Sequence, residues 1–261
     1  MEKLDLHGKT GFIIGGTRGI GNAIAMRMAR LGMNLTVIAR KEDELAAMKA
    51  QVEPLGVRFL GIQASNTDFD AIAAAFKTSW QTYGRLDLLV NAAGTGVMTP
   101  FEELTKSDVD TTIDVNLKGT IYAVKLSVPY FEKTGGGNIL NISSMNAYTP
   151  LTKIPAYSGA KAAISNFTQW LAVHFSKVGI RVNAIAPGFF VTKQNQALLF
   201  NEDGTPTPRT GKILAATPME RFGKPEELVG APMFLPNNAA ASFVTGVVIP
   251  VDGGFSAYSG V

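Results

Sequence analysis

The 261-residue sequence contains no cysteine and only two histidines. Without cysteine the chain has no disulfide, no thiolate metal ligand and no cysteine nucleophile. The two histidines lie far apart, with no cluster of acids beside them, so we expect no metal site. Charged residues make up 17% of the chain and the formal net charge is +3. Lysine and arginine are scattered, without the dense basic run of a nucleic-acid-binding tail.

Long apolar runs are also missing. No uninterrupted apolar stretch is long enough to span a bilayer, and the first residues carry acids where a signal peptide would be apolar. We therefore expect a cytoplasmic protein with neither a membrane nor a nucleic-acid partner. The sequence does contain 46% hydrophobic residues and 27 glycines, which is enough apolar surface for a core. A small-molecule substrate is the partner that this composition allows.

Short β-branched or apolar runs alternate with longer segments of helical period, a pattern typical of a parallel sheet covered by helices. We predict strands at 11–14, 35–38, 57–60, 86–90, 138–142, 180–185 and 247–249. We predict helices at about 20–31, 41–52, 68–82, 101–132, 156–177 and 225–235. No linker or internal repeat interrupts the series. Residues 1–261 are therefore expected to form a single α/β domain, a doubly wound sheet of seven parallel strands with helices on both faces.

Residues 188–220 depart from this alternation, and we call them the lid segment. They are rich in proline, threonine, asparagine and glycine, and they have no clear helical or strand period. A loop of this length is more often an active-site lid than a plain connector. We expect it to close over a substrate.

A glycine-rich turn directly follows the first predicted strand and opens the first predicted helix. Glycine at these positions lets the backbone turn tightly and approach a pyrophosphate, which then lies on the positive helix N-terminus. The turn predicts a Rossmann-type dinucleotide site. The residues of this turn that we expect at the cofactor are Gly15, Thr17, Arg18, Gly19, Ile20 and Gly21.

The end of the second predicted strand bears on the choice between NAD and NADP. An NAD enzyme usually has an acid there that binds the ribose 2′-hydroxyl, but here Ala39 is followed by Arg40 and Lys41. The guanidinium of Arg40, together with Arg18 from the glycine turn, would suit the dianionic 2′-phosphate. The sequence therefore predicts a preference for NADP(H). NAD(H) remains possible if Arg40 and Lys41 are only solvated charges at a helix start.

Tyr157 and Lys161 lie one turn apart on the same face of a predicted helix. A free tyrosine has a pKa of about 10 and is a poor base near neutrality. An ammonium close to Tyr157, with cofactor charge nearby, would lower that pKa by roughly three units at an effective dielectric near 20. Upstream, Ser143 and Ser144 end a predicted strand, where a hydroxyl can bind a substrate oxygen. The pattern indicates Tyr157 as a general acid or base.

These motifs, in this order, resemble those of the short-chain dehydrogenase/reductase family from about Leu6 to the end of the sequence. The further matching stretches are Asn91-Ala92-Ala93-Gly94, Val115-Asn116-Leu117, Ile142-Ser143-Ser144, Pro187-Gly188 and Val251-Asp252-Gly253-Gly254. The resemblance implies hydride transfer between a nicotinamide cofactor and a carbonyl or alcohol. It also implies a homotetramer.

The family resemblance assigns roles to individual positions. Ser144 matches the catalytic serine and would stabilise a developing oxyanion. Asn116 would hold a water in a proton relay with Lys161, whose ammonium would also bind the nicotinamide ribose. The implied catalytic residues are Asn116, Ser144, Tyr157 and Lys161. The implied cofactor contacts outside the glycine turn and Arg40 are Asn91, Ala92, Gly94, Tyr157, Lys161, Pro187, Gly188 and Thr192, with Thr192 at the carboxamide.

The sequence departs from the family pattern in three places. Ile14 stands where a threonine usually precedes the first glycine, which removes a supporting hydrogen bond. Ser65 and Asn66 replace an Asp-Val pair that commonly contacts adenine. Glu220 replaces a common glycine near the base of the lid segment. None of these positions belongs to the implied catalytic set.

The second half of the chain resembles a narrower branch of the family, the D-mannonate oxidoreductases (fructuronate reductases). The stretches that carry this similarity are 149–157, 165–170, 187–195 and 253–261. It implies a keto or hydroxy sugar acid of the D-fructuronate/D-mannonate type as the substrate. Lys153 would then bind the carboxylate, and Gln194 and Asn195 the sugar hydroxyls. Ser144 and Tyr157 would contact the reacting oxygen.

Two other hypotheses remain open. The chain could reduce a different carbonyl substrate, such as a ketogluconate, a polyol-forming ketone or a 3-oxoacyl carrier protein, although the polar lid segment disfavours acyl chains. It could also be a non-catalytic NADP-binding sensor. Such a sensor would be expected to lose Tyr157, Lys161 or Ser144, and all three are present.

Overall fold

The computed structural model describes residues 4–192 and 195–260. One parallel sheet of seven strands, in the order β3-β2-β1-β4-β5-β6-β7, forms the centre of the molecule. The strands are β1 (Thr10–Ile14), β2 (Asn34–Ala39), β3 (Phe59–Gln63), β4 (Leu88–Asn91), β5 (Gly137–Ile142), β6 (Ile180–Pro187) and β7 (Val248–Val251). The strand order reverses between β1 and β4. In doubly wound sheets such a reversal leaves a ligand-binding crevice at the carboxyl ends of the strands.

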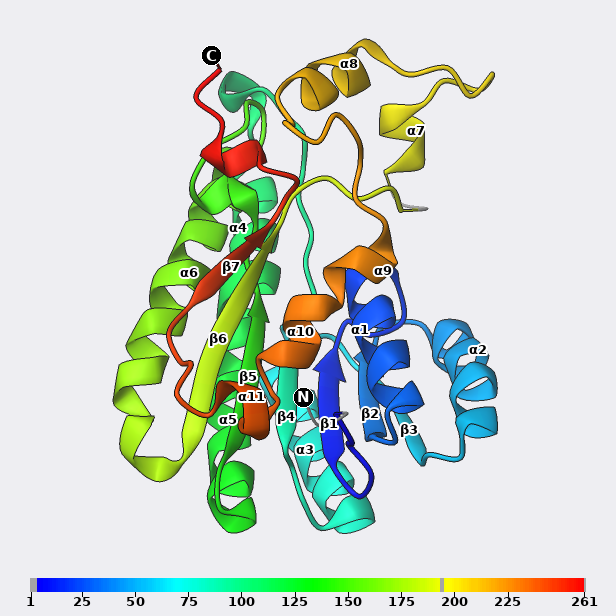
Figure 1. The fold of residues 1–261 in the computed structure, drawn as a ribbon, viewed down its shortest axis with the longest axis vertical. Helices are drawn as coiled ribbons and strands as arrows, with labels where there is room; N and C mark the ends of the chain where they lie inside the picture. The colour runs from blue at the N-terminus through cyan, green and yellow to red at the C-terminus, as the bar shows by residue number, and fades with distance from the viewer. Residues whose placement is uncertain (1–3, 193–194, 261) are drawn as a thin grey trace.

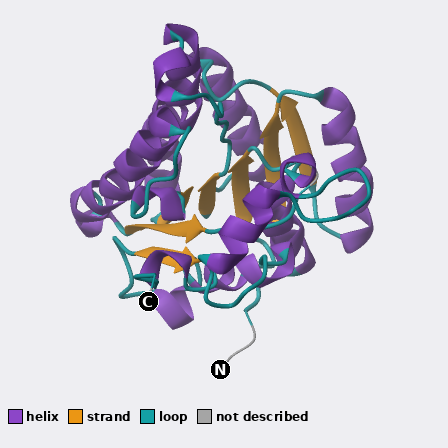
Figure 2. Ribbon diagram, turned by 90° about the horizontal axis from the view of Figure 1, so that it is seen from above, coloured by secondary structure: helices purple, strands orange, loops and turns teal. Residues whose placement is uncertain are grey.

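Helices cover both faces of the sheet, as Figures 1 and 2 show. One hydrophobic core lies under α1 (Gly19–Arg30), α2 (Glu42–Val52), α9 (Pro225–Leu228) and α10 (Gly230–Phe234). A second core lies under α3 (Phe69–Tyr83), α5 (Gly119–Thr134) and α6 (Pro155–His174). Because both faces are covered, β1 is buried along its whole length. The predicted fold class, a Rossmann-type doubly wound sheet, is confirmed.

Local chemistry explains where the helices lie and end. In α1, Ile24 and Met28 are fully buried one turn apart, which gives the helix a continuous apolar face toward the sheet. At the start of α3 the Asp68 side chain accepts a hydrogen bond from the main-chain N–H of Ala71 at 2.9 Å. The same helix ends at Gly84, which has a φ of 68° and so terminates the helix in the left-handed conformation.

The single helix predicted over 101–132 is wrong. The chain forms a 3₁₀ turn, η2 (Phe101–Glu103), then α4 (Lys106–Ile113), a π-helical turn, η3 (Asp114–Lys118), and α5. Thr105 and Asp108 form a capping box, so a new helix begins after Thr105. The hydrophobic period runs through all these pieces, which is why it suggested one helix.

Smaller differences concern element ends. The third strand begins at Phe59, two positions beyond the predicted start, and the last predicted helix is divided into α9 and α10. The remaining short elements are η1 (Glu53–Leu55), η4 (Met145–Ala147), η5 (Ser176–Val178), α11 (Asn238–Ala241) and η6 (Phe255–Ala257). No helix in the described ranges combines the length and apolar character needed to cross a bilayer.

The lid segment, expected to lack regular elements, contains two short helices, α7 (Gln196–Leu199) and α8 (Pro208–Ala215). The Thr207 hydroxyl accepts a hydrogen bond from the N–H of Thr210, and Pro208 occupies the first helical position of α8. This Thr-Pro pair is a helix-start signal hidden in a proline-rich stretch. In Figure 1 the segment, in yellow and orange, extends beyond the carboxyl ends of the strands.

Candidate active site

The glycine-rich turn follows β1 and opens α1, as predicted. A Cβ on Gly21 would lie 2.1 Å from the carbonyl oxygen of Gly15, so no other residue fits there. Gly15 itself has a φ of 81°, and a Cβ on it would lie 2.7 Å from Ala93. No side chain caps the start of α1, whose N–H groups therefore remain available to an anion. These features fit a dinucleotide pyrophosphate.

A cleft opens beside this turn, at the carboxyl ends of β1, β2 and β4. Its lining includes the predicted cofactor residues Gly15, Thr17, Arg18, Arg40, Ala92 and Gly94. Ser65 and Asn66 also line it, so the pair that departs from the family pattern does lie where adenine contacts were expected. The Asn66 amide donates to the carbonyl oxygen of Val115 at 2.8 Å, which ties this wall to the π-helical turn.

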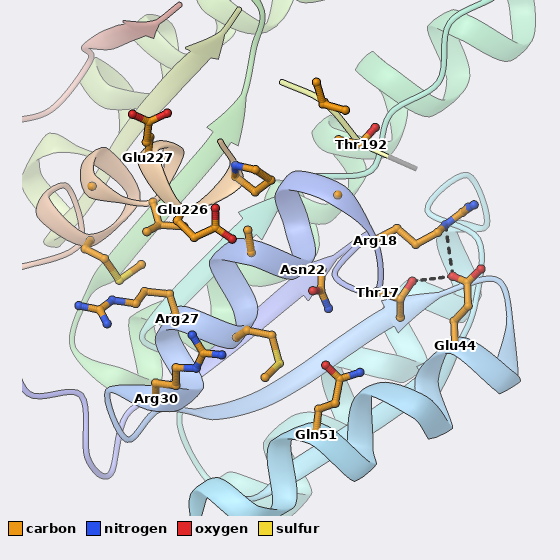
Figure 3. Close-up of a pocket in the computed structure, with 18 residues that line it drawn as sticks. Thr17, Arg18, Asn22, Arg27, Arg30, Glu44, Gln51, Thr192, Glu226 and Glu227 are labelled. Carbon is orange, nitrogen blue, oxygen red and sulfur yellow. Dashed lines mark hydrogen bonds and ion pairs between the residues drawn. The ribbon is translucent and has the colours of Figure 1, made fainter. Parts of the chain in front are cut away.

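Gly19 and Thr192 line a larger groove, of about 1030 Å³, that adjoins the cleft between α1, α2 and α9 (Figure 3). A Cβ on Gly19 would lie 3.9 Å from Thr192, so the base of the lid segment passes directly over the glycine turn. Pro187 ends β6, and a Cβ on Gly188 would lie 2.6 Å from Asp252. Glycine at 188 thus lets the chain leave the sheet close to Asp252.

Two predicted cofactor residues, Asn91 and Ile20, make their contacts within the protein core. Asn91 is 5% exposed at the end of β4, and its amide donates to the side-chain oxygen of Asn141 at 2.9 Å. The Asn141 amide in turn donates to the Thr168 hydroxyl at 3.0 Å. This buried chain of hydrogen bonds joins β4, β5 and α6 beneath the cleft. Ile20 is half-buried in the first turn of α1 and packs against the core.

Tyr157 and Lys161 lie on the first turns of α6. The Lys161 side chain is 4% exposed, and its Nζ donates to the carbonyl oxygen of Ile142 at 2.7 Å. Nζ also lies 5.5 Å from the centre of the Tyr157 ring. Burial lowers the pKa of Lys161 from 10.5 to about 8. The ammonium is thus the main form at pH 7, yet it loses its proton more readily than a solvated lysine.

Burial raises the pKa of Tyr157 above 10, and a hydrogen bond with Ser144 acts in the lowering direction with a smaller effect. The protein's side chains alone therefore move this pKa opposite to our expectation. The physical reason is that the buried phenol loses hydration, which costs the phenolate more than the hydrogen bond returns. Tyr157 is accordingly protonated at neutral pH.

The two serines after β5 face different partners. The Ser143 hydroxyl lies 2.7 Å from that of Ser165 and donates to the carbonyl oxygen of Lys161 at 3.0 Å. The Ser144 hydroxyl accepts from the N–H of Asn146 at 3.2 Å and interacts with the Tyr157 hydroxyl, whose pKa it lowers. This interaction groups Ser144, and not Ser143, with the predicted general acid.

Asn116 lies in the π-helical turn and is 1% exposed. Its amide donates to the carbonyl oxygen of Thr95 at 2.6 Å. A Cβ on Gly94 would lie 3.1 Å from the Asn116 side-chain oxygen and 3.8 Å from the Lys161 Nζ. Gly94 therefore leaves open the space where Asn116 and Lys161 converge. π-Helical turns are frequent at functional sites.

The predicted substrate residues are less closely grouped. Lys153 is exposed and has a φ of 67°, an unusual conformation for a non-glycine residue, and its carbonyl oxygen accepts from the N–H of Thr99. Asn195 uses its side chain within the lid segment, accepting from the N–H of Thr192 and donating to the carbonyl oxygen of Phe190, both at 2.8 Å. Gln194 lies outside the described residues.

Glu44, an acid that no sequence motif indicated, reaches the cofactor cleft from the first turn of α2. It accepts a hydrogen bond from Thr17 and pairs with Arg18. In NAD-binding sites of this kind the acid usually stands at the end of β2, several residues earlier, and no motif marks an acid in the following helix. Among the described residues, no three or more His, Asp or Glu side chains gather as a metal site.

A dinucleotide turn, a crevice at the strand reversal and a Tyr-Lys-Ser group beside it define a nicotinamide-dependent oxidoreductase. Residues 9–203 match the sequence model of the short chain dehydrogenase family. The chain therefore belongs to the short-chain dehydrogenase family, as its motifs predicted.

Several relatives match almost the whole chain. An uncharacterized oxidoreductase of Bacillus subtilis is 43% identical, with 98% of each chain covered. A 2-dehydro-3-deoxy-D-gluconate 5-dehydrogenase of Dickeya dadantii is 32% identical, covering 98% of this chain and 99% of its own. A crystal structure from Haemophilus influenzae, named as a candidate D-mannonate oxidoreductase with bound NAD, has a TM-score of 0.93, 42% identity and 98% coverage of both chains.

Proposed function

We propose that the protein transfers hydride between a nicotinamide cofactor and a keto or hydroxy sugar acid of the D-fructuronate/D-mannonate type. The observation that carries the proposal is the grouping of Tyr157, Ser144 and Lys161, with the Lys161 Nζ next to Gly94 in the wall of the dinucleotide cleft. The relatives support the substrate class, because those with named substrates include a candidate D-mannonate oxidoreductase and a dehydrogenase of a deoxygluconate.

In this mechanism the nicotinamide, when bound, supplies or accepts the hydride. For carbonyl reduction, the Tyr157 hydroxyl donates its proton to the carbonyl oxygen, and the hydroxyl of Ser144 donates a hydrogen bond to the same oxygen. Lys161 would then return a proton toward Tyr157, for which its pKa of about 8 is suitable. Asn116, converging with Lys161 near Gly94, would hold the water of this relay. Alcohol oxidation follows the reverse steps.

Lys153, which precedes α6, and the lid segment would supply the rest of the substrate site. Lys153 is exposed and would bind the carboxylate, while Asn195 orders the base of the lid segment through its hydrogen bonds. The predicted contact of Gln194 with a sugar hydroxyl stays a prediction. So do the cytoplasmic location, the homotetramer and the preference for NADP(H), which rests on Arg18 and Arg40.

The test is the loss of reduced-nicotinamide absorbance when D-fructuronate is added to the pure protein, run with NADH and NADPH in parallel. We expect turnover with D-fructuronate, and on the order of a hundredfold or greater loss of kcat in the Tyr157→Phe variant, with cofactor binding retained. Retained turnover in that variant would refute the role of Tyr157.

A 5-keto derivative of gluconate is the second candidate substrate, favoured by the named activity of the Dickeya relative. It should be assayed in parallel with D-fructuronate under the same conditions. Faster turnover of a 5-ketogluconate than of D-fructuronate would transfer the substrate assignment to the gluconate series and leave the mechanism unchanged. No turnover of either would overturn the sugar-acid assignment.

A further inference from the structure

The carboxylate of Glu44 lies between the glycine turn and the end of β2, in the wall of the cofactor cleft. One oxygen, Oε2, accepts a hydrogen bond from the Thr17 hydroxyl at 2.8 Å and lies 3.3 Å from Nε of Arg18 (Figure 3). The other, Oε1, lies 3.6 Å from Nζ of Lys41. The Glu44 side chain is only 20% exposed. The carboxylate is thus oriented by three partners and remains reachable from the cleft.

This arrangement changes the charge of the site that the sequence indicated. Two of the three cations near the end of β2, Arg18 and Lys41, are already paired with Glu44, and only Arg40 has no ion pair within the described ranges. A 2′-phosphate entering beside them would meet the carboxylate as well as the cations. The negative charges of the phosphate and of the Glu44 carboxylate would repel each other. Solvent ions screen this repulsion only weakly, because the carboxylate is largely buried.

One carboxylate oxygen of Glu44 can accept further hydrogen bonds. Oε1 makes no hydrogen bond with any described residue, since its distance to Lys41 exceeds hydrogen-bond length. A carboxylate oxygen with free lone pairs is the usual partner of ribose hydroxyls in dinucleotide sites. Glu44 therefore offers the chemistry that Ala39 lacks, from the following helix rather than from the strand.

We propose that Glu44 sets the cofactor preference of this protein and selects a dinucleotide with a free 2′-hydroxyl, NAD(H), over its 2′-phosphorylated form. The proposal rests on the proposed function only in that the cleft binds a nicotinamide dinucleotide. It runs against the preference expected from Arg40. To bind NADP(H) well, Arg18 would have to leave Glu44 for the phosphate, and the partly buried carboxylate would remain close to that phosphate.

The experiment measures binding without any substrate. Dissociation constants of NADH and NADPH are determined by isothermal titration calorimetry for the wild-type protein and for Glu44→Gln. The matched control is Glu42→Gln, which removes the same charge from the same helical turn, where the side chain is exposed and forms no ion pair with another described residue. Glu44→Asp shortens the carboxylate and is analysed alone if the glutamine variant does not fold.

The wild-type protein should bind NADH more tightly than NADPH. Glu44→Gln should shift the ratio of the two constants toward NADPH by about tenfold, which corresponds to about 1.4 kcal/mol. Glu44→Asp should shift it partway, and Glu42→Gln should leave it unchanged. A merely structural role would weaken both cofactors equally.

Tighter NADPH binding by the wild type would overturn the proposal. So would a ratio that is unchanged in the Glu44 variants, or one that shifts equally in Glu42→Gln. Failure of the proposed function has a different signature, because both cofactors would then bind normally while no sugar acid is turned over. Absence of binding by either cofactor would overturn both.

Discussion

Neighbouring serines at the end of β5 give a sharp test at the scale of single residues. Ser144→Ala removes the hydroxyl that interacts with Tyr157 and should lower kcat on the order of a hundredfold, because a developing oxyanion loses a donor. Ser143→Ala removes buried bonds to Ser165 and the main chain, and should lower the free energy of unfolding by about 1 kcal/mol. Steady-state kinetics and urea denaturation of both variants check this. A large loss of kcat in Ser143→Ala, with kcat retained in Ser144→Ala, would contradict the proposed role of Ser144.

Burial of Lys161 predicts a pH dependence of stability. Its pKa is about 8 in the folded protein and 10.5 when solvated, so between these values the unfolded chain binds more protons. Stability from this group therefore rises with pH across the window, by roughly 1 kcal/mol per pH unit. The measurement is the difference in free energy of unfolding between wild type and Lys161→Met at pH 7, 8 and 9. That difference should change little from pH 7 to 8 and shift in favour of the wild type above pH 8.

A strained residue near the base of the lid segment offers a stabilising substitution. Glu220, which replaces a common family glycine, has a φ of 51°. Glu220→Gly should raise the free energy of unfolding by about 1 kcal/mol, because glycine adopts this conformation without steric cost. Glu226→Gly, at an exposed position inside α9, is the matched control and should destabilise. Equal effects of the two changes in thermal denaturation would argue against strain at residue 220.

At the scale of elements, the sequence predicted the strands and the long helices well because hydrophobic period reports burial. It did not reveal the π-helical turn around Asn116, since a one-residue change of register leaves an apolar period nearly intact. The two helices of the lid segment were missed for the opposite reason, because they are too short to show a period. Glu44 was missed because its role depends on α2 facing the glycine turn, a tertiary arrangement that spacing does not encode.

Asn195 links the lid segment to the glycine turn beside the cofactor cleft. Asn195 bonds to the main chain of Thr192 and Phe190, and Thr192 lies over Gly19. Asn195→Ala should therefore raise the dissociation constant of the cofactor several-fold, since each bond contributes about 1 kcal/mol to the order of this loop. Asn201→Ala removes a comparable bond to Thr205, farther along the lid segment, and should leave cofactor binding unchanged. Calorimetric titration of both variants with the cofactor checks this. Equal dissociation constants in Asn195→Ala and the wild type would show that Asn195 does not influence the cofactor cleft.

At the scale of the whole molecule, large apolar side chains are exposed on α6 and on the segment before β7. Trp170 and Val173 on α6 are 56% and 77% exposed, and Phe243, before β7, is fully exposed. The two segments adjoin, because a Cβ on Gly246 would lie 3.3 Å from the Cβ of Ala172. Scattered apolar residues are ordinary on a surface, whereas apolar residues that gather there mark an interaction site, so these three side chains are candidates for a subunit contact.

Because the family resemblance predicts a homotetramer, we expect a second copy of the chain to cover this face. Closed symmetric assemblies bury the same patch on each subunit, so one charged substitution acts twice at a two-fold interface. Val173→Glu should therefore convert the tetramer expected for the wild type into dimers or monomers, as measured by size-exclusion chromatography with light scattering. Val178→Glu, at a less exposed apolar position just beyond α6, is the control and should leave the assembly intact. A monomeric wild type would contradict the assembly, while the site, built within one subunit, would still be expected to bind its cofactor.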